Sequence, residues 1–149
     1  MKSRVNVVTL AVADLQRAVT FYRDGLSLPT EGIIGSEFPS TPDRPGGETA
    51  MFDLDGGLIL SLYPASELAK DAGLPPDAIG GTGVSLGHVV PDRDDVDAVL
   101  RQAELAGATV LGEAHERPWG IYSGYFRDLD GHLWEVVHFL PGSGPDAGD

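Results

Sequence analysis

Residues 126–136 read FRDLDGHLWEV and carry the strongest indication of the fold. The turn at residues 128–131 stands between two stretches rich in aromatic and apolar side chains, which is typical of a β-hairpin. A shorter copy of this turn stands earlier in the chain. Residues 55–58 (DGGL) match residues 130–133 (DGHL), 75 positions apart. The match indicates an internal repeat, and a repeat decides the whole architecture.

A second match supports the repeat. Residues 12–15 (VADL) match residues 93–96 (RDDV), 81 positions apart. The two offsets differ by six residues, which the Pro- and Gly-rich segment 36–47 would absorb as a long loop. Two short matches become informative because the predicted elements around them also occur in the same order.

The first half predicts a strand, a helix and three strands. The apolar run 5–12 is a strand, Asp14 caps a helix that ends at Gly25, and Ser66 caps a short helix that ends at Ala72. Three further strands are predicted at residues 28–35, 48–53 and 58–63.

The second half predicts the same order. A strand at residues 84–90 precedes a helix that Asp94 or Asp95 caps and that ends near Gly107. Three more strands follow at residues 109–114, 122–127 and 132–139. We therefore expect one βαβββ module over residues 1–72, a linker over 73–83, a second module over 84–140 and a disordered tail over 141–149.

Composition excludes several classes of function. The 149 residues contain 10 Lys and Arg against 23 Asp and Glu, a net charge of −13. Such an acidic chain is expected to bind nucleic acid and anionic membranes poorly, and its charge favours the binding of a cationic compound. The lack of cysteine removes disulfides and thiolate chemistry. No signal peptide or membrane span is evident, so we expect a soluble, cytoplasmic protein.

Three stretches resemble the vicinal oxygen chelate superfamily, which includes glyoxalase I, bleomycin-resistance proteins and extradiol dioxygenases. They are residues 8–15 with Phe21-Tyr22 after them, residues 119–125 (WGIYSGY) and residues 126–136. Leu129 stands where the family usually has proline. The resemblance covers residues 4–140. It implies an α+β fold of two paired βαβββ modules that form a curved mixed sheet around a cleft, a homodimer, and a small organic molecule as ligand.

The resemblance also raises the question of whether this protein binds a divalent metal ion. Catalytic members hold one divalent metal with four side chains, one on the first and one on the last strand of each module. His88 and Glu135 stand at such places here, and their types suit Zn, Ni, Mn or Fe. The repeat offsets place the other two at Val7 and at Leu60 or Ser61, none of which is a usual ligand. A site of two histidines and one carboxylate would need a further histidine. His132 and His138 each stand three residues from Glu135, which disfavours them, and only the fold could bring His115 near.

The predicted ligand-contacting residues come from both halves. Four face the cleft from the first half: Val7, Thr9, Phe52 and Leu60. From the second half, Trp119 and Tyr122 form an aromatic wall for a flat ligand. His88 and Glu135 are the other two ligand contacts of this half, as a pair that could recognise a cationic ligand without a metal ion. Trp134 points away from Glu135, into the core. The loop 36–47, with Phe38, is either a mobile lid over the cleft or a disordered insertion.

Three functions follow from these expectations. The first is metal-free binding or sequestration of a small molecule, as in antibiotic resistance. The alternative is a divalent-metal-dependent lyase, isomerase or dioxygenase that uses His88 and Glu135, with Glu135 as a possible base. The third is a structural or regulatory dimer whose cleft is filled.

Overall fold

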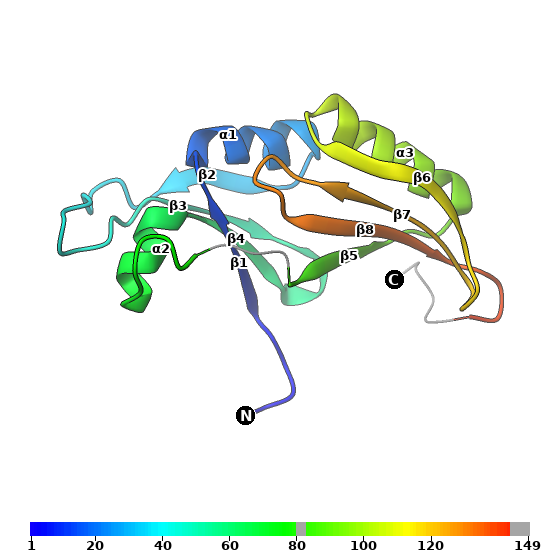
Figure 1. Ribbon diagram of the computed structural model, residues 1–149, viewed down its shortest axis with the longest axis horizontal. Helices are drawn as coiled ribbons and strands as arrows, with labels where there is room; N and C mark the ends of the chain where they lie inside the picture. Colours follow the sequence, from blue (N-terminus) through cyan, green and yellow to red (C-terminus); the bar gives the residue numbers. More distant parts are fainter. Residues whose placement is uncertain (80–82, 144–149) are drawn as a thin grey trace. The chain divides into compact units, whose positions relative to one another are not determined.

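The computed structural model describes residues 1–79 and 83–143 (Figure 1). The chain forms two compact units, Met1–Gly81 and Thr82–Asp149, and each is described here by itself. The division falls within the segment predicted as a linker. Residues 80–82 of that segment, and residues 144–149 of the predicted tail, lie outside the described residues.

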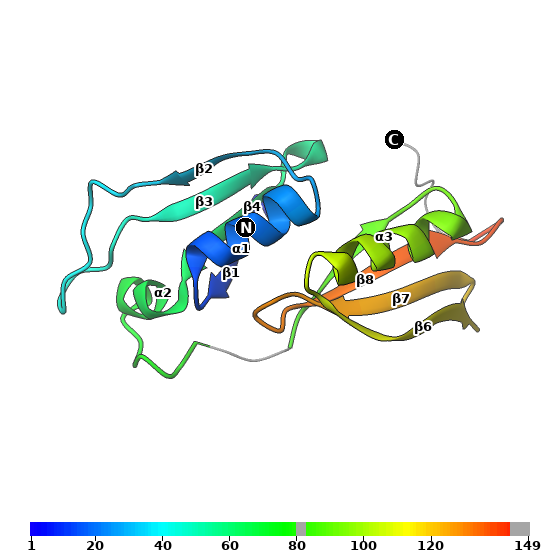
Figure 2. The same ribbon diagram turned by 90° about the horizontal axis from the view of Figure 1, so that it is seen from above.

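The first unit is built on a four-stranded mixed sheet with the order β1-β4-β3-β2. β1 and β4 are parallel, and the other pairs are antiparallel. The strands are β1 (Val7–Val12), β2 (Thr30–Ile34), β3 (Thr49–Asp53) and β4 (Ile59–Pro64). The helices are α1 (Leu15–Thr20), the π-helical turn η1 (Phe21–Gly25), the 3₁₀ turn η2 (Asp55–Gly57) and α2 (Ala65–Ala72). Figure 2 shows α1 lying along one face of this sheet.

The second unit repeats this plan with the order β5-β8-β7-β6. Again the first and last strands are parallel neighbours. The elements are β5 (Ser85–Val89), α3 (Arg93–Leu105), β6 (Thr109–Arg117), β7 (Ile121–Arg127) and β8 (Leu133–Phe139). α3 packs along one face of β6, β7 and β8 (Figure 2). The α+β class and the two βαβββ modules are therefore confirmed.

Each unit buries its core between its helix and one face of its sheet. The alternation of side chains along a strand makes this possible, because every second residue points to the same side. In the first unit the core side chains exposed by 2% or less include Val12, Val19, Phe52, Leu60 and Leu62. In the second unit they include Val96, Ala103, Phe126 and Val136.

The helix starts follow the capping rules, with two corrections to the sequence predictions. Asp14 caps α1 as predicted, since its carboxylate accepts the Arg17 backbone N–H at 3.0 Å. The second long helix begins earlier than predicted. Its cap is Asp92, which forms a reciprocal capping box with Asp95. Ser66 is not a cap, because α2 begins at Ala65 and the Ser66 hydroxyl bonds the neighbouring side chain of Glu67.

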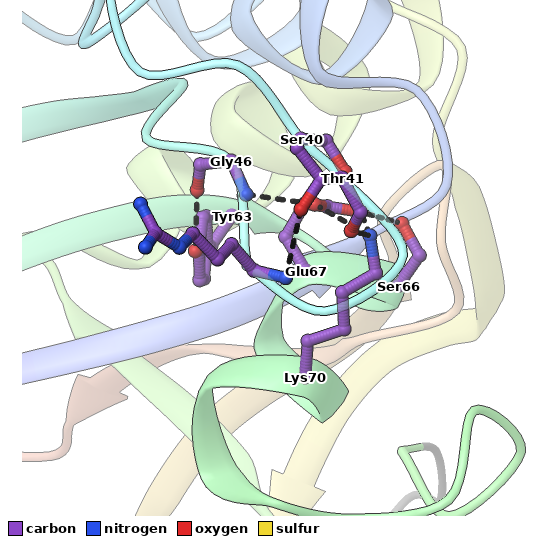
Figure 3. Close-up of polar contacts among 8 residues, drawn as sticks. Ser40, Thr41, Gly46, Tyr63, Ser66, Glu67 and Lys70 are labelled. Atoms are coloured by element: carbon purple, nitrogen blue, oxygen red, sulfur yellow. Dashed lines mark hydrogen bonds and ion pairs between the residues drawn. The ribbon is translucent and has the colours of Figure 1, made fainter.

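The long loop 36–47 is tied down onto α2 (Figure 3). The buried Glu67 carboxylate accepts the Gly46 backbone N–H at 2.8 Å and the Lys70 ammonium at 3.1 Å. Lys70 in turn donates to the Ser40 hydroxyl and to the Thr41 carbonyl. Hydrogen bonds from Ser40 and Gly46 are the main cause that lowers the Glu67 pKa from 4.5 to about 2. The description of this loop as a disordered insertion is therefore wrong for this structure.

Among the helices of residues 1–79 and 83–143, none combines the length and the apolar character that a membrane crossing requires.

Candidate functional site

The two sheets each have a far face, by which we mean the side that points away from α1 in the first unit and from α3 in the second. Strand register assigns residues to these faces. In the second unit the α3 face is marked by Tyr122, whose hydroxyl donates to Asp97 of α3 at 2.9 Å. It is also marked by Gly124, where an added Cβ would lie 2.6 Å from Leu100 of α3. Residues between these two positions belong to the far face.

The structure places His88 and Glu135 on opposite faces of their sheet. Glu135 is the register partner of Gly87, and His88 is the partner of Val136, one residue later on both strands. Val136 is fully buried beside α3. Glu135 therefore lies on the far face and His88 on the α3 face, at the edge strand. The His88 side chain is exposed, yet desolvation by the surrounding protein lowers its pKa.

Two predicted ligand contacts of the first unit are core residues instead. Phe52 and Leu60 are register partners and are exposed by 0% and 1%. The Phe52 ring meets Tyr22 of η1 edge-on, with ring centroids 6.0 Å apart. These side chains belong to the helix side of the sheet, because their positions on β3 and β4 have the parity that faces α1.

The other two predicted contacts of the first unit do lie on its far face. Val7 pairs with Ile59 and Thr9 with Ser61, at positions that alternate with the buried ones. Val7 is 47% exposed. The far face of the first unit is thus lined by small apolar and hydroxyl side chains at this point.

The two predicted aromatic contacts of the second unit differ in position. Tyr122 is buried on the α3 face, with the Arg93 guanidinium 4.1 Å from the centre of its ring. Desolvation and the hydrogen bond to Asp97 raise the Tyr122 pKa. Trp119 is 70% exposed in the turn between β6 and β7. Trp134 stacks on Phe126 at 6.0 Å on the α3 side, opposite to Glu135 as predicted, but it is half-buried and not part of the buried core.

A row of polar side chains crosses the far face of the second unit. Glu135 on β8 pairs with Tyr125 on β7, and Ser123 on β7 pairs with His115 on β6. Arg117, two residues after His115, shares that face. We call these five residues the polar row. It places an acid, a phenol, a guanidinium and an imidazole side by side on one surface.

Within the polar row, Arg117 is held by neutral partners. Its Nε donates to the Ser123 hydroxyl at 3.3 Å, and its Nη2 donates to the Ser123 carbonyl at 3.4 Å. Its Nη1 lies 2.6 Å from Nε2 of His115, whose Nδ1 lies 3.1 Å from the Glu113 carbonyl. Because Arg can only donate, His115 Nε2 accepts and its Nδ1 carries the proton.

Tyr125 stands between the two charged groups of the row. The Arg117 guanidinium carbon lies 5.8 Å from the centre of the Tyr125 ring. Desolvation and the nearby Glu135 carboxylate raise the Tyr125 pKa, and Arg117 opposes them. The phenol therefore stays protonated at neutral pH and serves as a hydrogen-bond donor.

The residues present do not suit a four-ligand metal site. The caps Asp14 and Asp92 are 78 residues apart, so Thr9 is the counterpart of Gly87. Their partners Ser61 and Glu135 are counterparts on the last strands. Of these four far-face positions, only Glu135 is a usual ligand for a divalent transition metal.

The other histidines do not supply a metal cluster either. His138 is the register partner of Tyr122 and therefore lies on the α3 face. His115 is engaged with Arg117. In the part of the chain that the structure describes, no three side chains of His, Asp or Glu gather closely enough to hold a metal ion.

Sequence reasoning missed most of the polar row. It named Glu135, but not the roles of His115, Arg117, Ser123 and Tyr125. The sequence pattern that could have revealed them is the spacing of two residues that places side chains on one face of a strand. It occurs at positions 115 and 117 on one strand and at 123 and 125 on the next. The predicted strand ended at residue 114, whereas β6 continues to Arg117, and that error hid the pattern.

Comparisons with known proteins bear on this fold. Residues 4–136 match the family described as the Glyoxalase/Bleomycin resistance protein/Dioxygenase superfamily. An ethylmalonyl-CoA/methylmalonyl-CoA epimerase of Cereibacter sphaeroides is 30% identical over 145 residues, covering 91% of this chain and 98% of that protein. An uncharacterized protein of Mycobacterium bovis is 27% identical over 129 residues, covering 85% of this chain and 78% of its own length.

Solved structures agree. A glyoxalase-related enzyme from Fulvimarina pelagi has a TM-score of 0.73 at 25% identity, covering 91% of this chain and 88% of its own. A lactoylglutathione lyase from Agrobacterium tumefaciens has a TM-score of 0.63 at 26% identity, covering 93% and 95%. Because the family match spans most of the sequence and the repeated module is present in both units, this chain belongs to the Glyoxalase/Bleomycin resistance protein/Dioxygenase superfamily.

Proposed function

We propose that this protein binds a small organic molecule on the far face of its second sheet, through the polar row, and that it does so without a metal ion. The observation that carries this proposal is the place of Glu135. It faces Gly87 on one side and Tyr125 on the other. A carboxylate in this setting accepts hydrogen bonds from a ligand rather than completing a coordination sphere.

Several features support recognition of an organic ligand there. Tyr125 offers a ring face, and its hydroxyl is a donor. Glu135 is a pure acceptor, and Arg117 is a pure donor. Few but well-placed polar groups of this kind fix the orientation of a small molecule. Trp119, exposed in the hairpin that carries Arg117, remains our prediction for a stacking contact. Sequestration of a harmful compound, as in resistance proteins, is the biological role that we favour.

A second function is favoured by one comparison. The epimerase of Cereibacter sphaeroides resembles this chain over nearly its full length. An epimerase must remove and return a proton, which needs a base, and Glu135 is the candidate base here. A metal-dependent lyase, isomerase or dioxygenase is the wider form of this alternative. His88 cannot assist Glu135 from within this unit, because it lies on the other face of the sheet.

Metal content and ligand mapping test the first function together. Untagged protein is incubated with Zn, Ni, Mn or Fe(II), passed through a desalting column and measured by mass spectrometry. We expect far less than one metal per chain. A fragment library is then screened by amide NMR, and we expect shifts at Ser123, Tyr125 and Glu135. One tightly held metal per chain, lost in Glu135→Gln, would overturn the metal-free proposal.

A separate assay tests the alternative. Methylmalonyl-CoA is incubated with the protein in heavy water, with and without added metal, and the incorporation of deuterium is followed by mass spectrometry. We expect no incorporation above the level of a protein-free control. Incorporation that disappears in Glu135→Gln would establish the epimerase function instead.

Two expectations from the sequence stand as part of this proposal. The chain pairs as a homodimer, and it acts in the cytoplasm. Size-exclusion chromatography with light scattering checks the first of these directly.

A further inference from the structure

We propose that the ligand of the polar row carries a carboxylate and that Arg117 binds it. This inference rests on the proposed small-molecule site and names the chemical class that the site takes. It reverses the expectation from the net charge of −13, which favours a cationic compound. Recognition depends on the groups within a few ångströms of the ligand, because salt screens more distant surface charges beyond about 8–10 Å.

Among the described residues, Arg117 has no carboxylate as a hydrogen-bond partner. Within residues 1–79 and 83–143, its hydrogen bonds go to the hydroxyl and carbonyl of Ser123 and to His115, which are all neutral acceptors. Arg93, by comparison, pairs with the Glu116 carboxylate. In a chain with 23 acidic residues, a half-buried guanidinium held only by neutral groups retains its attraction for an anion.

The Arg117 guanidinium is held in place and still has N–H donors that can bind a ligand. A guanidinium has five N–H bonds, and the three contacts with Ser123 and His115 use three of them. The other two stay available for the two oxygens of a carboxylate. Because three contacts already fix the side chain, little rotamer entropy is lost when the anion binds.

The order of groups along the polar row sets the orientation of such a ligand. Arg117 and Glu135 stand on either side of Tyr125, and no ion pair joins them. A ligand whose carboxylate meets Arg117 therefore extends over the Tyr125 ring and presents its other end to Glu135. Glu135 repels a second carboxylate and accepts a hydroxyl or ammonium group. The row thus favours a molecule with an acid at one end and a donor at the other.

Four small aromatic probes of similar size test this assignment: benzoate, phenyl phosphate, benzylamine and benzyl alcohol. Each is titrated into the full-length protein while the amide spectrum and tryptophan fluorescence are followed. We expect benzoate to bind most tightly, with shifts at Ser123 and Tyr125. Arg117→Gln should weaken benzoate by about tenfold or more, because a charge-assisted contact is lost.

Control variants separate the contact with the anion from general disruption. Arg117→Lys keeps the charge and should retain part of the benzoate affinity. Glu135→Gln should raise the benzoate affinity, because it removes a negative charge from the row. Arg93→Gln, which removes an arginine that pairs with Glu116 on the α3 face, should leave the benzoate affinity unchanged. The circular dichroism spectrum of Arg117→Gln should match that of wild type, which shows that the variant is folded.

The outcomes distinguish this inference from the proposed function. If benzylamine or benzyl alcohol shifts the polar row and benzoate does not, the carboxylate assignment is overturned while the small-molecule site stands. If phenyl phosphate binds more tightly than benzoate with the same dependence on Arg117, the ligand class is a phosphate and the assignment is again overturned. If none of the four shifts the polar row, the small-molecule site itself is overturned.

Discussion

At the scale of single residues, Glu67 shows how one carboxylate fixes a long loop. Its partners come from the loop and from α2, which are far apart in sequence. The Tyr63 hydroxyl adds a 2.6 Å bond to the Gly46 carbonyl at the same point. A backbone N–H that is buried and bonded to a carboxylate is costly to leave without its acceptor.

Glu67→Gln is expected to lower the free energy of unfolding at pH 7 by about 1–3 kcal/mol, because the neutral amide is a weaker acceptor for Gly46 and Lys70. The folded pKa of about 2 lies below the ordinary glutamate value of 4.5, which applies to the unfolded chain. The stabilisation is therefore complete above about pH 5 and is lost as the pH falls towards 2. Urea unfolding at pH 7 and pH 3 measures this, and a difference between wild type and variant that does not shrink at pH 3 would refute it.

The sequence predicted Glu135 as a site residue but did not predict Arg117 and Tyr125, and the difference is explained at the level of the individual residues. Glu135 was named because the family that the sequence resembles carries a metal ligand on the last strand of each module. Arg117 and Tyr125 were not, because their role depends on which residues face each other across β6 and β7. The register between strands is set by turns and packing, and it cannot be predicted from the type of any single residue.

At the scale of elements, a three-residue error in one helix start changed the predicted site. The sequence has acidic residues at positions 92, 94 and 95, and each suits an N-cap. Choosing Asp95 gave a repeat offset of 81, whereas the observed cap Asp92 gives 78. The difference is odd, and an odd shift moves a strand residue to the opposite face. The existence and order of the strands did not depend on it and were predicted correctly.

Gly124 of β7 tests the packing of α3 on its sheet. An added Cβ would lie 2.6 Å from Leu100 and 3.2 Å from the Cβ of Ala114. Gly124→Ala should therefore destabilise the protein by about 1–3 kcal/mol, as overpacked cores do. Denaturant unfolding measures the loss. Gly87→Ala is the matched control, since a Cβ there meets nothing within 4 Å, and equal losses in the two variants would contradict the argument.

A substitution at Gly87 tests whether the protein lacks a metal site because too few ligands lie beside Glu135. Its register partner is Glu135, and it has room for a side chain on the far face. Gly87→His should raise the affinity for Zn by about tenfold or more over wild type, because it supplies a second ligand beside a carboxylate. Isothermal titration measures it. Wild type is the control, because its His88 stands one position later and lies on the opposite face of the sheet from Glu135. An equal Zn affinity in both proteins would count against the face assignment.

At the scale of the whole molecule, the net charge of −13 bears on stability. Like charges repel one another in the folded chain, and salt screens this repulsion. Raising NaCl from near zero to about 0.15 M should raise the melting temperature by a few degrees. Differential scanning calorimetry measures it, with sucrose of equal osmolality as control. A melting temperature that falls with salt would show that attractive ion pairs dominate instead.

The pairing of the first strand with the last in each unit has a consequence for synthesis on the ribosome. Val7 of β1 pairs with Ile59 of β4, and Ser85 of β5 pairs with Leu133 of β8. Neither sheet can close until its final strand has left the exit tunnel, and such distant pairings are slow to form. The first unit is nevertheless fully synthesised before β5 has emerged. Each half can therefore close around its own helix in turn, which limits pairing between equivalent strands of the two repeats.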